Sequence, residues 1–185
     1  MAKDFPALTA HHREFIARQH MFFTASAAAG TRINISPRST DWFRITGDNS
    51  ACYLDRTGSG NETSAHMLAD GRMTIMFCAV DGPPLILRLY GIGRVIHRGT
   101  DEYAGLLFEH FADAEPLGAR QIVWLDYDLV KTSCGYGVPF FEYQGERDTM
   151  DRWAESKGPD GIEAYWKEKN VTSMDGLPTG MPVGE

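Results

Sequence analysis

After one amphipathic segment near its start, the chain changes to a series of short runs rich in aromatic and β-branched residues. These runs lie at 21–27, 31–37, 42–47 and 51–55, and turn-forming residues separate them. The strands therefore come as hairpins and not as a strand–helix–strand series. This order favours a small antiparallel barrel with peripheral helices and disfavours a doubly wound parallel sheet.

Longer strands and several helices complete the predicted elements. Residues 72–80 form a nearly continuous apolar run, which predicts a central strand buried on both faces. Two more long strands are predicted at 85–96 and 120–131, and Gly91 and Gly93 would allow the first of these to bend. The predicted helices cover 9–20, a short stretch after the glycine-containing loop at 58–61, 101–113, and most of the chain from 146. The last ten residues before the terminal Glu are expected to form an extended arm outside the core.

Charge and composition exclude several classes of protein. The 18 Lys and Arg residues against 25 Asp and Glu give a formal net charge of −7, whereas nucleic-acid binding relies on clustered basic residues. Three scattered cysteines and a start without an apolar leader predict a reduced, cytoplasmic protein. No apolar run approaches the ~20 residues that span a bilayer, and the six histidines show no metal-ligand spacing. We therefore expect no nucleic-acid partner, no membrane span and no metal site.

Four stretches, in this order, resemble a known family: INISPRS (33–39), YLDRTGSGNET (53–63), GRMTIMFCA (71–79) and ILRLYGIGRV (86–95). They are similar to those of the pyridoxamine 5'-phosphate oxidase-like FMN-binding split β-barrels. The resemblance covers about residues 15–130. It implies a mainly β (α+β) fold, an antiparallel split β-barrel with peripheral helices. It also implies a homodimer that binds FMN at the subunit interface, with the phosphate gripped by basic and hydroxyl side chains.

Two departures from this family limit what the resemblance implies. Gly60 and Asn61 stand where pyridoxamine phosphate oxidase proper carries an Arg-Lys pair, and the C-terminal third does not look like the substrate-binding tail of that enzyme. Oxidation of pyridoxamine phosphate itself is therefore not expected. We expect an FMN-binding split-barrel domain over 1–145, with 146–185 as a helical extension and arm packed on the same domain.

The strand at 31–37 supplies the first half of a predicted phosphate site. Ile33 and Ile35 point to one side of this strand, while Arg32 and Ser36 share the other. The Ser36 hydroxyl can donate to a phosphate oxygen, and the Arg38 guanidinium can grip one through two parallel hydrogen bonds. The alternative is a strand-end turn with a solvated arginine.

The loop at 58–63 supplies the second half. Its glycines would let backbone N–H groups approach an anion, and the following helix would present the positive end of its dipole. Ser59, Asn61 and Thr63 could add side-chain hydrogen bonds. A simple alternative is that Ser59 and Glu62 form a capping box, which needs no ligand.

Arg88 and Tyr136 are the remaining predicted cofactor contacts. Arg88 interrupts an apolar strand, so it either faces water or an ion-pair partner, or contacts the phosphate or the polar edge of the flavin. Tyr136 lies between two glycines and could cover one face of the flavin ring. The alternative is a turn in which Tyr136, Phe140 and Phe141 pack at a dimer contact.

These observations predict an FMN-dependent oxidoreductase acting on an unidentified small organic substrate. The flavin would supply the redox chemistry, so the sequence need not contain a dedicated catalytic acid or base. Two alternatives stay open: a non-catalytic protein that binds or senses flavin, deazaflavin or haem, and a barrel without a cofactor that serves in protein association.

Overall fold

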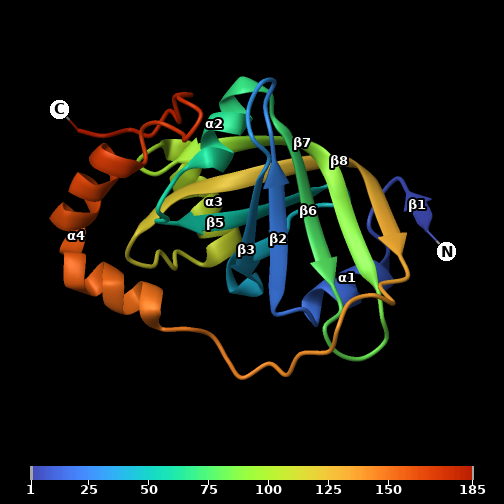
Figure 1. Cartoon of the computed structure of the whole chain (residues 1–185). Coiled ribbons are helices and arrows are strands. Elements are labelled where there is room, and N and C mark those ends of the chain that lie inside the picture. Colours follow the sequence, from blue (N-terminus) through green and yellow to red (C-terminus); the bar gives the residue numbers. More distant parts are fainter. Residues whose placement is uncertain (1, 185) are drawn as a thin grey trace.

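One antiparallel sheet, curled into a half-barrel, dominates the computed structural model, which describes residues 2–184 (Figure 1). Seven strands are hydrogen-bonded in the order β3-β2-β6-β7-β8-β5-β4, and β1 pairs with β8. All pairings are antiparallel. The strands are β1 (Lys3–Phe5), β2 (Met21–Ser26), β3 (Asn34–Ser39), β4 (Phe43–Ile45), β5 (Ser50–Arg56), β6 (Arg72–Cys78), β7 (Ile86–His97) and β8 (Ala119–Ser133). The predicted fold class is confirmed.

The helices lie around this sheet, with α2 beyond one end of the strands and α4 standing apart at its side (Figure 1). They are α1 (Ala10–Ala17), the 3-10 turn η1 (Thr40–Trp42), α2 (Glu62–Ala69), α3 (Asp101–Phe111) and α4 (Thr149–Lys169). Thr9 caps α1 as predicted, since its side chain accepts from the backbone N–H of His12. Gly158 interrupts α4 with a φ of 65°, so the C-terminal region forms two helical pieces, as the sequence predicts.

Apolar side chains fill both faces of the sheet. Phe22, Phe77, Leu89 and Val130 belong to the larger cluster inside the curl. A second cluster lies on the other face, where α3 covers β5, β7 and β8. Gly91 allows a close strand contact, because a Cβ at this position would lie 2.0 Å from the carbonyl oxygen of Asp126. The register of β7 against β8 shifts at this point, which confirms the predicted irregularity.

One burial prediction is wrong. Residues 72–78 alternate between buried and partly exposed side chains, so β6 is not buried on both faces. In β3 the predicted alternation is present, and its polar side faces inward. Ile33 and Ile35 are 72% and 64% exposed, while Asn34, Ser36 and Arg38 face a cavity. The apolar side of β3 therefore lies on the outer surface of the single chain.

The C-terminal arm is extended, as predicted, but part of it is core. Thr179 is fully buried, and Met181 packs with Ala154, Ile162 and Trp166 of α4 in a third apolar cluster. The division of the chain into a unit over 1–145 and an extension over 146–185 stays a prediction. The contacts below show how closely the C-terminal segment is joined to the sheet.

Candidate functional site

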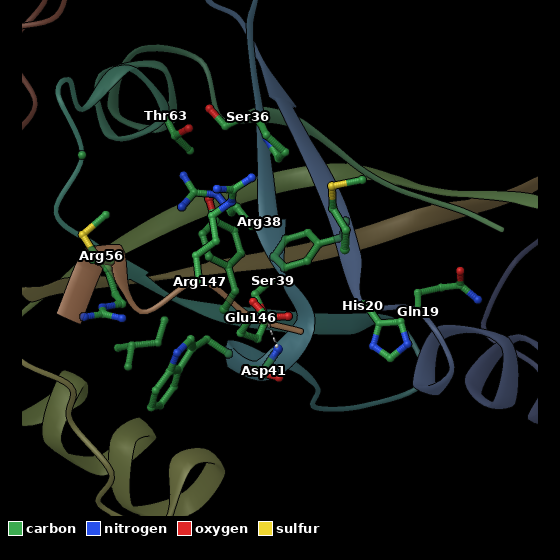
Figure 2. A pocket seen from close by; sticks show the side chains of 18 of the residues that line it. Gln19, His20, Ser36, Arg38, Ser39, Asp41, Arg56, Thr63, Glu146 and Arg147 are labelled. Carbon is green, nitrogen blue, oxygen red and sulfur yellow. Dashed lines mark hydrogen bonds between the residues drawn. The ribbon is translucent and has the colours of Figure 1, made fainter. Parts of the chain in front are cut away.

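An open cavity of about 1140 Å3 lies between β2, β3 and β5 on one side and segment 141–151 on the other. It exceeds the roughly 300–1,000 Å3 typical of small-molecule sites, as expected for a wide groove. Figure 2 shows side chains from distant parts of the chain converging on it. The residues that line it include Ser36, Arg38, Thr63, Arg120 and Arg147.

A buried carboxylate organises the inner wall of this cavity. Asp55, near the end of β5 and 1% exposed, pairs with Arg38 and accepts from Nε of Arg120 at 2.9 Å and from Nε2 of Gln121 at 2.7 Å. Burial opposes ionisation of Asp55, but the guanidinium groups of Arg120 and Arg38 outweigh it and hold the pKa of this carboxyl below its usual range. The single carboxylate of Asp55 thus neutralises only one of the two guanidinium charges, which leaves one surplus positive charge at the wall.

Arg38 lines the cavity, as the phosphate prediction requires, but it is not a solvated arginine. Its Nη1 pairs with Asp55, its Nε donates to Oγ1 of Thr24 at 3.4 Å, and its guanidinium carbon lies 4.6 Å from the ring centre of Tyr53. Burial disfavours its charge, but the neighbouring Asp55 more than compensates and raises the pKa of Arg38. The side chain is therefore held in a fixed direction before any ligand binds.

The hydroxyl groups of Ser36 and Thr63 meet at the same cavity. Asn34 joins them, because its Nδ2 donates to Oγ of Ser36 at 3.4 Å and to Oγ1 of Thr63 at 3.3 Å. Both hydroxyl oxygens act as acceptors in these bonds, so their O–H groups are available to donate to an anion. The structure therefore brings Ser36, Arg38 and Thr63 together, although the first two lie about 25 residues before the third.

The loop before α2 differs from its predicted details. Ser59 lines the cavity, but the Ser59–Glu62 capping box does not form, since α2 begins after Asn61 without a side-chain cap. Asn61 is 2% exposed and accepts from Nε2 of Gln121 at 2.8 Å. Its side chain supports the loop from behind and does not line the cavity.

Three predicted contacts lie away from this cavity. Arg32 is bound to Asp175 of the C-terminal arm, and Arg88 donates to Oγ of Ser133 at 3.1 Å. Tyr136 is 81% exposed on the turn after β8. None of the three lines the cavity in the described chain, so their assignment as flavin ligands stays a prediction without support from this geometry.

The C-terminal region contributes to the site in a way that no sequence motif indicates. Arg120 donates to Oδ1 of Asn170 at 2.7 Å, and Asn170 in turn donates to the carbonyl oxygen of Gly58 at 3.2 Å. Trp166 donates from Nε1 to Oγ1 of Thr57 at 2.7 Å. The end of α4 therefore holds the loop that leads into α2. Only the folded chain reveals these partners, because they lie more than 100 residues from the loop.

Segment 141–151, in front of the cavity, was also not predicted to supply ligands. Arg147 projects into the cavity from this segment (Figure 2). Arg56 and Asp151 also line it and form an ion pair at 2.6 Å. The sequence shows Arg147 only as one charge in a polar stretch, which is usually a solvated surface.

The geometry fits an anion carried by a larger ligand. A surplus positive charge, two hydroxyl donors and a cavity long enough for an attached ring system match the chemistry of a phosphate ester. Among residues 2–184, no cluster of three or more His, Cys, Asp or Glu is arranged to hold a metal ion. None of the helices described in this range has the length and apolarity to cross a membrane.

Comparison with known proteins gives the family. A family model described as pyridoxamine 5'-phosphate oxidase matches residues 8–134. A curated pyridoxamine 5'-phosphate oxidase family protein, ustO of Aspergillus flavus, is 33% identical over 190 residues, which cover 94% of this chain and 76% of the fungal protein. The chain belongs to the pyridoxamine 5'-phosphate oxidase family.

Solved structures show the fold of this family member. HupZ of Group A Streptococcus aligns with a TM-score of 0.54 and 18% identity, over 66% of this chain and 91% of that chain. A putative pyridoxamine 5'-phosphate oxidase of Lactobacillus delbrueckii aligns with a TM-score of 0.52 and 14% identity, over 68% and 94%. At such identities the likeness shows the split-barrel fold and nothing about the ligand.

Proposed function

We propose that this member of the pyridoxamine 5'-phosphate oxidase family binds FMN and acts as an oxidoreductase on a small organic molecule. The observation that carries this proposal is the convergence of Ser36, Arg38 and Thr63 on one wall of a large cavity. In this proposal the phosphate lies against these three side chains, and the ring system extends along the groove.

The residues of the cavity would bind and orient the flavin. The Arg38 guanidinium, fixed by Asp55, would donate to the phosphate, and the Ser36 and Thr63 hydroxyls would donate from the neighbouring elements. FMN would supply hydride transfer when bound. Since the flavin carries that chemistry, the cavity residues need only position it and exclude competing reactions.

The proposal includes a homodimer. Ile33 and Ile35 expose their apolar side chains next to the cavity wall, around the edge strand β3. An exposed apolar edge is a favourable place for a second chain to pack, and an unpaired edge is otherwise prone to aggregation. A partner at this edge would lie beside the mouth of the flavin cavity.

Haem is the second candidate ligand, and one observation favours it. His20 lines the same cavity, and an imidazole is a common axial ligand of haem iron. A haem-binding or flavin-storing protein would use the same barrel without turnover. The absorbance spectrum of the purified protein separates the two cofactors, and reduction of a bound flavin by NADH or NADPH, followed by reoxidation with an acceptor, separates an enzyme from a carrier.

The decisive variant is Arg38→Ala. We expect its affinity for FMN to fall by about 1.5–3 kcal/mol, the value of a charge-assisted hydrogen bond. Arg72→Ala is the matched control, since Arg72 also pairs with a single aspartate but is exposed and does not line the cavity. Titration of each apoprotein with FMN measures the effect, and sedimentation of the same samples tests the dimer. Equal affinities in the two variants would remove Arg38 from the site.

A further inference from the structure

A strap of residues 134–148 connects β8 to α4 (Figure 1), and its residues from Phe141 to Tyr143 and from Gly145 to Arg147 line the cavity. The buried Gly135 at its start lies against the backbone of Leu85, and two contacts hold its middle part. The backbone N–H of Phe141 donates to the carbonyl oxygen of Val80 at 3.0 Å, and Tyr143 stacks on His20 with ring centres 3.7 Å apart and planes 1° apart. Most other strap side chains are exposed, so the strap is attached at a few points and not packed along its length.

Arg147 stands out from the other arginines that line the cavity. Arg38 and Arg120 share the carboxylate of Asp55, and Arg56 pairs with Asp151. Within residues 2–184, Arg147 forms no ion pair. Its charge is therefore the least neutralised of the four.

Two of the carboxylates that line the cavity already accept hydrogen bonds from other groups. Glu146 accepts from the hydroxyl of Tyr143 at 2.9 Å, and Glu62 accepts from the backbone N–H of Met174 at 3.1 Å. Two more cavity carboxylates, Asp41 and Glu142, lie on η1 and in the strap. The inner wall, where Arg38 and Arg120 outnumber Asp55, is thus the positive end of the groove.

In Figure 2 the side chains of Arg38 and Arg147 point into the same part of the cavity, below Ser36 and Thr63. They arrive from opposite sides, one from β3 and the other from the strap. The loop at 58–61, which reads GSGN, brings no cation of its own. A doubly charged phosphate at this place would therefore meet one half-neutralised guanidinium on the barrel and one unpaired guanidinium on the strap.

We propose that Arg147 is an anion-binding residue that completes the phosphate site from the strap side. This inference rests on the proposed function and names the group that closes the site. Because the strap has few contacts of its own, a phosphate that bridges Arg38 and Arg147 joins the strap to the barrel and orders it. Binding of the ligand and closure of the strap are then one event.

The first test compares Arg147→Ala, Arg147→Lys and the control Arg152→Ala. Arg152 is an exposed arginine five residues further along, paired with Asp148, so its removal changes the net charge equally. We expect Arg147→Ala to weaken FMN binding about 10-fold or more, Arg147→Lys to restore part of it, and the control to change little. Binding of riboflavin, which lacks the phosphate, should be the same in all four proteins.

Arg147 is itself a trypsin site, which provides a second readout. FMN should slow cleavage after Arg147 in the wild-type protein, and cleavage after Arg152 should slow much less. Folding of the variants is checked by circular dichroism, and inorganic phosphate is used as an additional probe of the anion site.

The outcomes separate this inference from the proposed function. If wild-type protein binds FMN and Arg147→Ala binds it as tightly as the control does, Arg147 is not a ligand and the proposed function stands. If wild-type protein binds no FMN, the proposed function is wrong, and protection of the Arg147 cleavage site by inorganic phosphate decides the inference alone. If neither FMN nor inorganic phosphate protects the Arg147 cleavage site, the inference about Arg147 is overturned.

Discussion

The two walls of the cavity are built in opposite ways. The inner wall is supported from behind by polar groups that are almost fully buried, with Asp55, Arg120, Gln121, Asn61 and Asn170 joined in one hydrogen-bonded network. The outer wall is the part of the strap from Phe141 onward, whose side chains are exposed and which one backbone hydrogen bond and one stacked pair hold to the barrel. The chain thus combines a fixed surface with an adjustable one around the same ligand volume.

This difference between the walls predicts different costs in stability when residues of each wall are replaced. Buried charges are tolerated only when they are paired and fully hydrogen-bonded, so each member of the inner network depends on the others. Exposed pairs and stacked rings contribute little to global stability, and segments of this kind open locally at low cost. Damage to the inner wall should therefore lower the free energy of unfolding, whereas damage to the strap should mainly change binding and local dynamics.

The largest effect is expected from Asp55→Asn. This change leaves Arg38 and Arg120 without a counter-charge, and loss of one partner from a buried ion pair costs about 3–5 kcal/mol. Urea unfolding measures the change, with Asp128→Asn at an exposed position of β8 as the control. A loss no larger than that of the control would show that the network does not hold the inner wall.

Low pH should destabilise the protein as Asp55→Asn does, because it protonates the same carboxylate. The pKa of Asp55 is lower in the folded protein than its ordinary value of 3.8, so its stabilising contribution is present above that value and is lost as the pH falls through the lower, folded-state pKa. The free energy of unfolding of the wild-type protein should thus decrease below about pH 4, with a smaller slope for Asp55→Asn. Parallel slopes in the two proteins would assign the acid sensitivity to other carboxyl groups.

An intermediate effect is expected from Asn170→Ala. The variant removes one hydrogen bond from Arg120 and one to Gly58, and such losses at buried groups cost about 1–3 kcal/mol. Hydrogen exchange should increase in residues 57–61, which Asn170 and Trp166 hold from behind. Glu168→Ala, on the exposed side of the same helix end, is the control. Unchanged exchange in the loop would mean that the C-terminal region does not support the site.

The smallest effect on global stability is expected from Tyr143→Ala. Loss of the stacked pair with His20 should change the free energy of unfolding very little, because both residues are exposed, but it should release residues 139–147 for hydrogen exchange while β8 stays protected. Tyr136→Ala, at a strap tyrosine that is 81% exposed, is the control. A large drop in global stability would contradict the contrast between the two walls.

Much of the fold could be predicted from local sequence signals. Turn residues and short alternating runs indicated the hairpins, Thr9 indicated the start of α1, and Gly91 indicated the irregularity in β7. What the strand pattern does not predict is which side of a strand is buried, because that depends on what packs against it. Ile33 and Ile35 alternate with polar residues as expected, but alternation alone does not say which side faces the core, and here the polar side faces a cavity.

The candidate site was only partly predictable for a similar reason. Ser36, Arg38 and Thr63 stand in recognisable strings, so the sequence indicated them. Arg120, Asn170 and Arg147 stand in no motif. The first two are placed by contacts between residues 50 or more positions apart, and Arg147 is known only from its place in the cavity lining. Long-range polar partners leave no periodic signal, so a single sequence does not reveal them.

The position of Asn170 bears on how this protein is made. The loop at 57–61 and strand β8 leave the ribosome well before α4, yet Arg120 and Gly58 receive their partner only when residue 170 has been synthesised. At a synthesis rate of about 5–20 residues per second, the segment between the end of β8 and Asn170 takes roughly 2–7 s to add. A chain truncated before α4 would keep every strand of the barrel, but its Arg120 would lack the hydrogen bond to Asn170.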